Sequence, residues 1–239
     1  QNTSDGAPMG VFDGAIDELR MYPRTLTDQE IYALSQAGGG GGTGNDQDRE
    51  QYFAFDEGQG GSVTESVSGQ SLAIQGGYSW VPGRVGQALQ FNGTNTSIVT
   101  DSIVKDNFTF AAWIKPASDG SNRLILGQGE SGSSINMFNW WIANGKMEFL
   151  MADELGQGHN LWPLATATGS IPLNEWTHVA VSKSGSQFKL YVNGQLAVSK
   201  SASSAIPQVD NPNPFRIGGQ NLTGDATEVF HGAIDELRM

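Results

Sequence analysis

Short runs of alternating apolar and polar residues follow one another along most of the chain after residue 50. A period of two is typical of strands that bury one face. Turn residues, mainly Gly, Asn and Ser, separate the runs at close spacing, which predicts an antiparallel β-sandwich. The predicted strands are 51–55, 72–75, 88–91, 97–100, 108–114, 124–126, 138–143, 146–151, 177–182, 187–192, 195–199, 215–217 and 229–238.

Two of the turns are predicted in detail. Asn144-Gly145 and Asn193-Gly194 stand between alternating runs. Both residues of an Asn-Gly pair accept the positive φ angles of a type I′ turn, so each pair predicts a tight β-hairpin.

One short helix is predicted near the N-terminus. Thr27 and Glu30 have the spacing of a capping box, in which each residue satisfies the backbone amide of the other. Ile31 and Leu34 then form a helical apolar stripe. The rest of the chain shows no comparable helical pattern.

One strand occurs twice. VFDGAIDELRM at Val11–Met21 recurs as VFHGAIDELRM at Val229–Met239, and Asp13 against His231 is the one difference between them. Such self-similarity indicates a repeated unit, and the two copies compete for one slot. We expect the C-terminal copy to close its own domain, because a short connection joins it to the strand at 215–217. The N-terminal copy is expected to dock as an extra segment on its own domain or on a neighbouring molecule.

Composition divides the chain into three parts. Residues 1–36 hold the first strand copy and the helix, and they are predicted to be the tail of a preceding repeat. Residues 37–50 are rich in glycine and are predicted to be a flexible linker. Residues 51–239 are predicted to form the sandwich domain, since a chain of this length buries a sizeable core as one all-β domain.

The charge balance limits the possible partners. The chain has 25 Asp and Glu against 13 Lys and Arg, and its basic residues form no cluster. This argues against nucleic acid and anionic membranes as partners and favours a neutral polymer or a cation. No apolar run is long enough to cross a membrane. Cysteine is absent, which excludes disulfides and thiolate chemistry.

A set of motifs carries a family resemblance. The motifs are FAFDEGQG at 53–60, VPGRVGQALQFNG at 81–93, FTFAAWIKP at 108–116, EWTHVAVS at 175–182, FKLYVNGQLA at 188–197, FRIGG at 215–219 and the final GAIDELRM. In this order, over residues 52–239, they resemble the laminin-G-like, concanavalin A-like jelly-roll domains of bacterial secreted proteins. The resemblance implies an all-β, antiparallel jelly-roll sandwich and a secreted or cell-surface location in a bacterium.

The same fold is shared with laminarinase-type glycoside hydrolases and some alginate lyases. A retaining hydrolase of that type needs the pattern E-x-D-x-E, which holds two carboxyls about 5 Å apart. The nearest grouping here, Glu148, Asp153 and Glu154, lacks this spacing, because Glu148 and Asp153 would face opposite sides of one strand. The lyase pattern is also missing. We therefore predict no catalysis, with a divergent hydrolase or lyase as the less favoured alternative.

The tryptophans differ in their predicted roles. Trp113 and Trp176 alternate with apolar neighbours and match core positions of the resembled family, so they are predicted to pack in the core. Trp140 and Trp141 are adjacent in one strand and must face opposite sides. Because the core claims Trp140, Trp141 is predicted to lie on the sheet surface. Trp162 lies in a predicted loop with polar neighbours.

These surface positions form a predicted sugar site. An exposed indole offers a flat apolar face on which a pyranose stacks, while nearby polar groups bind its hydroxyls. The alternative is that the rings merely cover loops. The predicted sugar-binding residues are Trp141, Trp162, Asn139, His159, Asn160 and Glu148.

The resemblance further implies a structural Ca²⁺, held where the last strand passes the N-terminal strand and a nearby turn. The corresponding residues here are Asp235, Asp56, Asn92 and Gly93. Carboxylate and carbonyl oxygens are the ligands that Ca²⁺ prefers. The alternative is that Asp235 simply faces solvent.

Together these patterns predict a non-catalytic carbohydrate-binding module, one of a tandem series, whose partner is a polysaccharide or glycan. The rival interpretation is a structural or adhesive spacer repeat that binds no soluble ligand. Self-association through the duplicated strand is also expected, whereas nucleic acid binding and membrane insertion are not.

Overall fold

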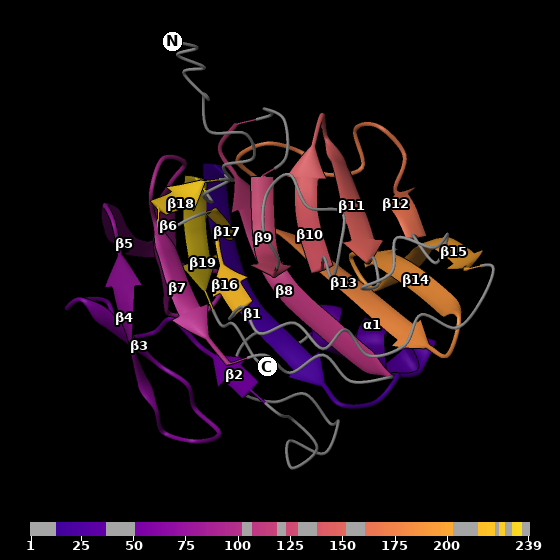
Figure 1. Cartoon of the computed structure of the whole chain (residues 1–239), viewed down its shortest axis with the longest axis horizontal. Helices are drawn as coiled ribbons and strands as arrows, with labels where there is room; N and C mark the ends of the chain where they lie inside the picture. Colours follow the sequence, from indigo (N-terminus) through magenta and orange to yellow (C-terminus); the bar gives the residue numbers. More distant parts are fainter. Residues whose placement is uncertain are drawn as a thin grey trace, which may run out of the picture.

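Two large β-sheets lie face to face and form a sandwich (Figure 1). Within the described residues the neighbouring strands pair antiparallel, apart from one parallel pair, β1 with β19. The predicted antiparallel jelly-roll sandwich is therefore confirmed. The computed structural model describes residues 13–36, 51–101, 107–118, 123–128, 138–151, 161–202, 215–222, 225–227 and 231–235.

The first sheet has nine strands, eight of which form one continuous order, while β2 pairs with β1 beside it. In spatial order the strands are β15 (Gln195–Ser201), β14 (Gln187–Val192), β13 (Thr177–Ser184), β8 (Phe108–Pro116), β1 (Asp13–Tyr22), β19 (His231–Asp235), β6 (Gln87–Asn92) and β5 (Tyr78–Pro82), with β2 at Gln51–Phe53.

The second sheet has eight strands, and a separate two-stranded ribbon consists of β17 (Gln220–Leu222) and β18 (Asp225–Thr227). In spatial order the eight strands are β12 (Leu161–Ala165), β11 (Lys146–Met151), β10 (Phe138–Ala143), β9 (Arg123–Gln128), β16 (Phe215–Ile217), β7 (Ser97–Thr100), β4 (Ser71–Gln75) and β3 (Ser62–Thr64).

The edge strand β12 corrects one prediction. Trp162 lies within this strand and not in a loop, because β12 pairs with β11 through Met151 and Leu161. Pro163 obscured the strand in the sequence, since proline interrupts a ladder. At the edge of a sheet, however, a strand has one side without a neighbour and tolerates a proline there.

Both predicted hairpins are confirmed. Asn144 and Gly145 have φ angles of 50° and 67°, and Asn193 and Gly194 have φ angles of 50° and 75°. Two successive positive φ values are what a type I′ turn requires.

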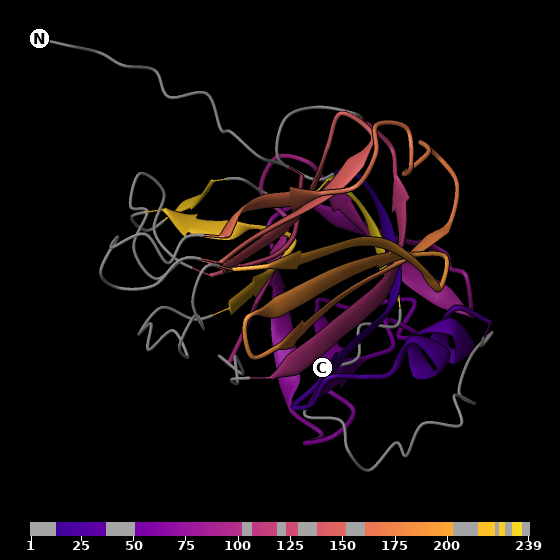
Figure 2. The same cartoon turned by 90° about the vertical axis from the view of Figure 1, so that its right-hand side faces the viewer.

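The predicted helix is also confirmed as α1 (Asp28–Gln36). The amide of Glu30 donates to Thr27 Oγ1 at 3.2 Å, and the amide of Thr27 donates to Glu30 Oε2 at 2.8 Å, which completes the capping box. Ile31 and Leu34 are buried as the apolar stripe predicts. The helix lies against the outer face of the nine-stranded sheet (Figure 2). There Ile31 and Leu34 pack with Tyr22, Leu26, Ala111, Ala180 and Tyr191.

The core between the sheets is rich in phenylalanine. Phe108 and Phe110 of β8 meet Phe138 and Phe149 of the opposite sheet, with ring centroids between 5.1 and 6.2 Å apart, and Phe138 also meets Phe215 at 5.2 Å. These rings come from distant parts of the sequence, so the core fixes the pairing of the two sheets.

The two copies of the duplicated strand lie between β8 and β6, where they pair with each other in parallel and share pairing partners on both neighbouring strands. Asp13 and His231 both pair with Asn92 of β6, and Asp17 and Asp235 both pair with Trp113 of β8. Each edge of a strand offers one set of backbone hydrogen-bonding groups. The shared positions on β6 and β8 can therefore pair with one copy at a time.

Both copies contribute pairs to this position. Within the described residues, β1 pairs with β8 as far as Tyr22, and β19 pairs with β8 from Gly232 to Asp235. Since each copy also pairs with β6, which of the two closes the domain stays a prediction. The assignment of residues 1–36 to a preceding repeat stays a prediction.

Candidate functional site

The predicted sugar residues on β10 and β11 lie on the outer face of the eight-stranded sheet. Trp140 is fully buried in the core, and Trp141 packs on the opposite face with Leu124, Ala143 and Leu150, so the predicted alternation is confirmed. The predicted exposure of Trp141 is wrong, because only 7% of this residue is exposed. An indole covered to this extent has no free face on which a sugar could stack.

Glu148 lies directly across from Trp141 in the β10–β11 ladder. Burial raises the pKa of Glu148, while the ammonium of Lys146 and the indole N–H of Trp141 oppose this shift. The Trp141 N–H has no partner in hydrogen-bond geometry, so its effect on Glu148 is electrostatic. Asn139 pairs with Leu150 one step along the same face and is 6% exposed.

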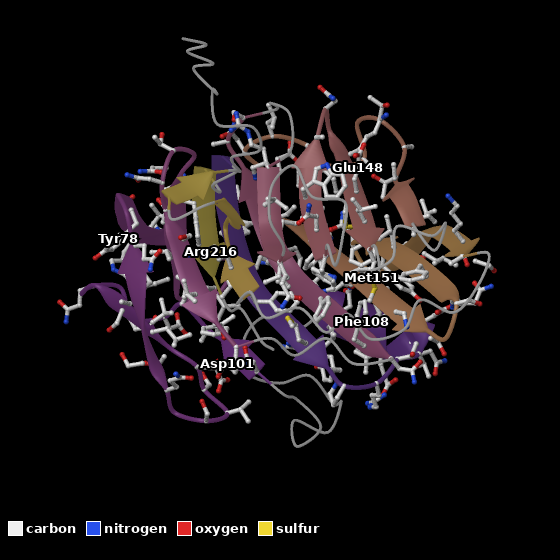
Figure 3. All side chains as sticks on the ribbon, viewed as in Figure 1. Tyr78, Asp101, Phe108, Glu148, Met151 and Arg216 are labelled. Atoms are coloured by element: carbon white, nitrogen blue, oxygen red, sulfur yellow. The ribbon has the colours of Figure 1, made fainter. Side chains whose placement is uncertain are left out.

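A second polar group on this face is already engaged. Arg216 of β16 donates through Nη1 to Gln75 Oε1 at 3.0 Å and to Ser97 Oγ at 3.3 Å. Figure 3 labels Arg216 and Glu148 on their two strands. Burial lowers the pKa of Arg216. Its guanidinium therefore joins β16, β7 and β4 and is structural in the described part of the sheet.

The remaining predicted sugar residues are only partly described. Trp162 is placed in β12 by its backbone, whereas His159 and Asn160 lie outside the described residues. The structure thus brings Trp141, Glu148 and Asn139 together, and their role in binding sugar stays a prediction.

The predicted calcium ligands do not form one set. Asp56 Oδ1 accepts the amide of Gln87 at 2.8 Å, at the first residue of β6, while Asn92 and Gly93 lie at the other end of that strand. Five strand residues span about 16 Å, far beyond the reach of one ion. Asn92 Oδ1 is also occupied by the amides of Thr94 and Asn95.

The described residues contain no cluster of three or more His, Asp or Glu side chains that could hold a metal ion. The side chain of Asp235 is outside the described part, so calcium binding stays a prediction.

A pocket of about 410 Å³ opens on the outer face of the nine-stranded sheet. Its walls come from the end of α1, the turn after β5, strand β8, the start of β13 and the hairpin between β14 and β15. The lining residues are Ser35, Gln36, Arg84, Trp113, Trp176 and Asn193.

Trp113 reaches this pocket because of the strand period. Phe110, Ala112 and Ile114 of β8 point into the core, so Trp113 and Ala111 point to the outer face. Trp113 is 6% exposed, and its ring meets the ring of His178 edge-on at 5.4 Å. The predicted burial of Trp113 is confirmed, but its predicted place in the core between the sheets is wrong.

The guanidinium of Arg84 lies over the indole of Trp113. Its Cζ is 4.7 Å from the ring centroid, a cation–π distance, and Arg84 itself is exposed. Trp176 is half-buried against Ala88 and forms another wall of the same pocket. Two indoles and one guanidinium thus face one cavity.

His178 is buried against the ring of Trp113 and is uncharged. Burial, assisted by the positive charge of the buried Arg20, lowers the pKa of His178 to about 3. The imidazole is therefore neutral near pH 7, and Arg84 is the charged residue among those that line the pocket.

Sequence reasoning missed Trp113 and Trp176 as candidate site residues. Their apolar neighbours suggested core packing, yet the alternation in FTFAAWIKP already placed Phe108, Phe110 and Ile114 on one face and Trp113 on the other. For Trp176, which precedes β13, the strand pattern gives no such signal.

Comparison with known proteins places the chain in a family. The family model described as the concanavalin A-like lectin/glucanases superfamily (Laminin G 3) matches residues 89–239, more than half of the chain. The chain belongs to this superfamily. A search of curated proteins finds no match.

Solved structures agree on the fold. Domain 4 of AbnA, a GH43 extracellular arabinanase from Geobacillus stearothermophilus solved with arabinotriose, superposes with a TM-score of 0.57 at 17% identity, over 78% of this chain and 88% of that chain. A Trypanosoma rangeli sialidase mutant with trans-sialidase activity gives a TM-score of 0.53 at 17% identity, over 77% of this chain and 29% of that chain.

A third match is the CBM40 of the Ruminococcus gnavus IT-sialidase bound to α2,3 sialyllactose. Its TM-score is 0.47 at 20% identity, over 54% of this chain and 71% of that chain. At their low identities, the first two likenesses establish the fold alone.

Proposed function

We propose that the chain is a non-catalytic carbohydrate-binding module of a secreted or cell-surface bacterial protein, and that the outer pocket is its sugar site. The pocket carries this proposal, because about 410 Å³ is lined by the half-buried indole of Trp176 and by amide, hydroxyl and guanidinium groups, while Trp113 lies beneath Arg84. This volume falls within the usual range for small-ligand sites. A pyranose presents its CH face to an indole and its hydroxyls to the polar groups.

The superfamily and its structural neighbours support a sugar as the ligand class. The superfamily includes lectins, and the Geobacillus domain that shares the fold was solved with arabinotriose. Within the described residues no helix is both long and apolar enough to cross a membrane.

The described carboxylates favour binding over hydrolysis. A glucanase needs two carboxyls that face one cleft. Glu148 lies across from Trp141 on one side and Ala165 on the other, and the pocket residues include no carboxylate. A spacer without a ligand is the remaining alternative.

The test is a pull-down on insoluble polysaccharides, together with a glycan array, for the wild-type chain, Trp176→Ala and Glu148→Gln. We expect binding that is lost in Trp176→Ala and retained in Glu148→Gln, because Glu148 lies on the opposite sheet. Loss of glycan binding in Glu148→Gln, with binding retained in Trp176→Ala, would show that the sugar site lies around Trp141 instead. Binding to no glycan would favour the spacer, and release of reducing sugar would favour an enzyme.

A further inference from the structure

We infer that the pocket recognises a sugar that carries a carboxylate, with Arg84 as the residue that binds the carboxylate and Trp176 as the platform for the sugar ring. This inference rests on the proposed function and names the ligand class for the same pocket.

The charge of the pocket is the first argument. The whole chain has a net charge of −12, which disfavours acidic ligands over most of its surface. The lining of the pocket has the opposite character, since Arg84 is its charged residue and the others are Ser, Gln, Asn and Trp. Among the described residues, no carboxylate forms an ion pair with Arg84, unlike Arg24 with Glu30 and Lys189 with Asp28.

The geometry of Arg84 is the second argument. Stacking on an indole holds the plane of a guanidinium and leaves its N–H edges available, and this planar edge matches the two oxygens of a carboxylate. The indole of Trp113 under Arg84 is itself fixed, because it is 6% exposed and packs against His178. Arg84 is therefore oriented before a ligand arrives, which lowers the entropic cost of binding.

The end of α1 supplies the complementary acceptors. Ser35 and Gln36 are the last residues of the helix, whose final carbonyls lack intrahelical partners and whose last turn contains no basic residue. A helix C-terminus favours hydroxyl donors and disfavours an anion close to it. The pocket thus combines the polar groups of Ser35 and Gln36, which suit the hydroxyls of a uronic acid residue, with the guanidinium of Arg84, which suits its carboxylate.

A neighbouring cavity provides an internal comparison. A second pocket of about 360 Å³ on the same sheet contains Lys115 and Asn174. Lys115 offers a point charge without the stacked, planar edge of Arg84, so we expect it to contribute less to recognition of a carboxylate.

The experiment measures binding of the full chain to three polyuronates, namely polygalacturonate, alginate and glucuronan, and to their carboxyl-reduced forms. Each reduced polymer keeps the linkage and loses the charge. We expect the wild-type chain to bind at least one polyuronate more tightly than its reduced form. Arg84→Gln should weaken polyuronate binding roughly 10- to 100-fold, as expected for a lost hydrogen bond to a charged group, and leave binding to the reduced polymer unchanged.

Matched variants separate the possible outcomes. Trp176→Ala should weaken binding to both forms, whereas Lys200→Gln, which removes an exposed charge on β15 away from the pocket, should change neither. Thermal melting confirms that each variant is folded, and because Arg84 is exposed its replacement should not alter the fold.

Equal binding to charged and reduced polymers, or an Arg84→Gln variant with wild-type affinity, would overturn the acidic-sugar inference while leaving the proposed function intact. Loss of polyuronate binding in Lys115→Gln instead of Arg84→Gln would show that the sugar binds in the second pocket. This result would also overturn the inference about Arg84. If no sugar on any panel binds, the proposed function fails together with this inference.

Discussion

Replacement of Ile31 by alanine tests whether the N-terminal strand and helix are an integral part of the sandwich. Ile31 is 0% exposed and packs with Ala111, Ala180 and Tyr191 of the nine-stranded sheet. Truncation of a buried isoleucine to alanine usually costs about 2–5 kcal/mol, and the better helix propensity of alanine returns a few tenths of this. We expect the free energy of unfolding to fall by roughly 2–4 kcal/mol, and the melting temperature by roughly 5–15 °C for a chain of this size.

Two controls make this result interpretable. Tyr32 lies on the same helix and is 47% exposed, so Tyr32→Ala should change stability by less than about 0.5 kcal/mol. Ile125 is buried between the sheets, so Ile125→Ala should destabilise the chain whether or not α1 is docked.

Circular dichroism during urea and thermal unfolding of the full chain gives both quantities. A wild-type transition for Ile31→Ala, with a destabilised Ile125→Ala, would show that α1 is not packed on the sheet in solution. A separate early transition in Ile31→Ala would show that residues 13–36 unfold on their own, which contradicts a single cooperative unit.

Three further predictions follow from single groups. His178 is buried with a pKa of about 3, below its ordinary value of about 6.5. Below pH 6.5 the histidine is protonated in the unfolded chain but stays neutral in the folded chain. The free energy of unfolding should therefore fall by roughly 2 kcal/mol as the pH drops from 6.5 to 5. Denaturant titrations at several pH values measure this fall, which should be smaller in His178→Phe. Gly76 has a φ of 76°, and a Cβ there would lie 2.1 Å from the carbonyl oxygen of Asn95, whereas Gly169 has a φ of 78° and nothing within 4 Å. Gly169→Ala should cost about 1–2 kcal/mol for its positive φ and Gly76→Ala clearly more, so equal melting temperatures would count against the close approach. Ca²⁺ is predicted to raise the melting temperature, and this increase should be smaller in Asp235→Ala. Identical melting curves in Ca²⁺ and in EDTA would contradict a structural calcium ion.

Most of the fold could be predicted because its signals are local. The alternation in FNWWIA and the Asn144-Gly145 turn fix β10, β11 and the hairpin between them with no knowledge of distant residues. The capping box of α1 is equally local. Strand β12 escaped prediction because its proline is tolerated only at a sheet edge, and the position of a strand in its sheet is a property of the whole topology.

The candidate site was harder to predict because exposure depends on what covers a face. The period of two correctly separates Trp140 from Trp141, but it does not report that Leu124 and Leu150 cover the second ring. The separation of two proposed calcium ligands was hidden for a similar reason, since only the paired sheet shows that Asp56 and Asn92 lie at opposite ends of β6. The outer pocket combines Arg84 with the end of α1, a meeting that no local pattern encodes.

The shared pairing partners of β1 and β19 imply two alternative ways to close this sheet. Either copy of GAIDELRM matches Ile114 and Trp113 on β8, so the relative rates of the two closures would decide which one forms. The two closures would differ at the pocket, because Ser35 and Gln36 reach it on the helix that follows β1. We therefore expect a ligand of this pocket to favour closure by the N-terminal copy.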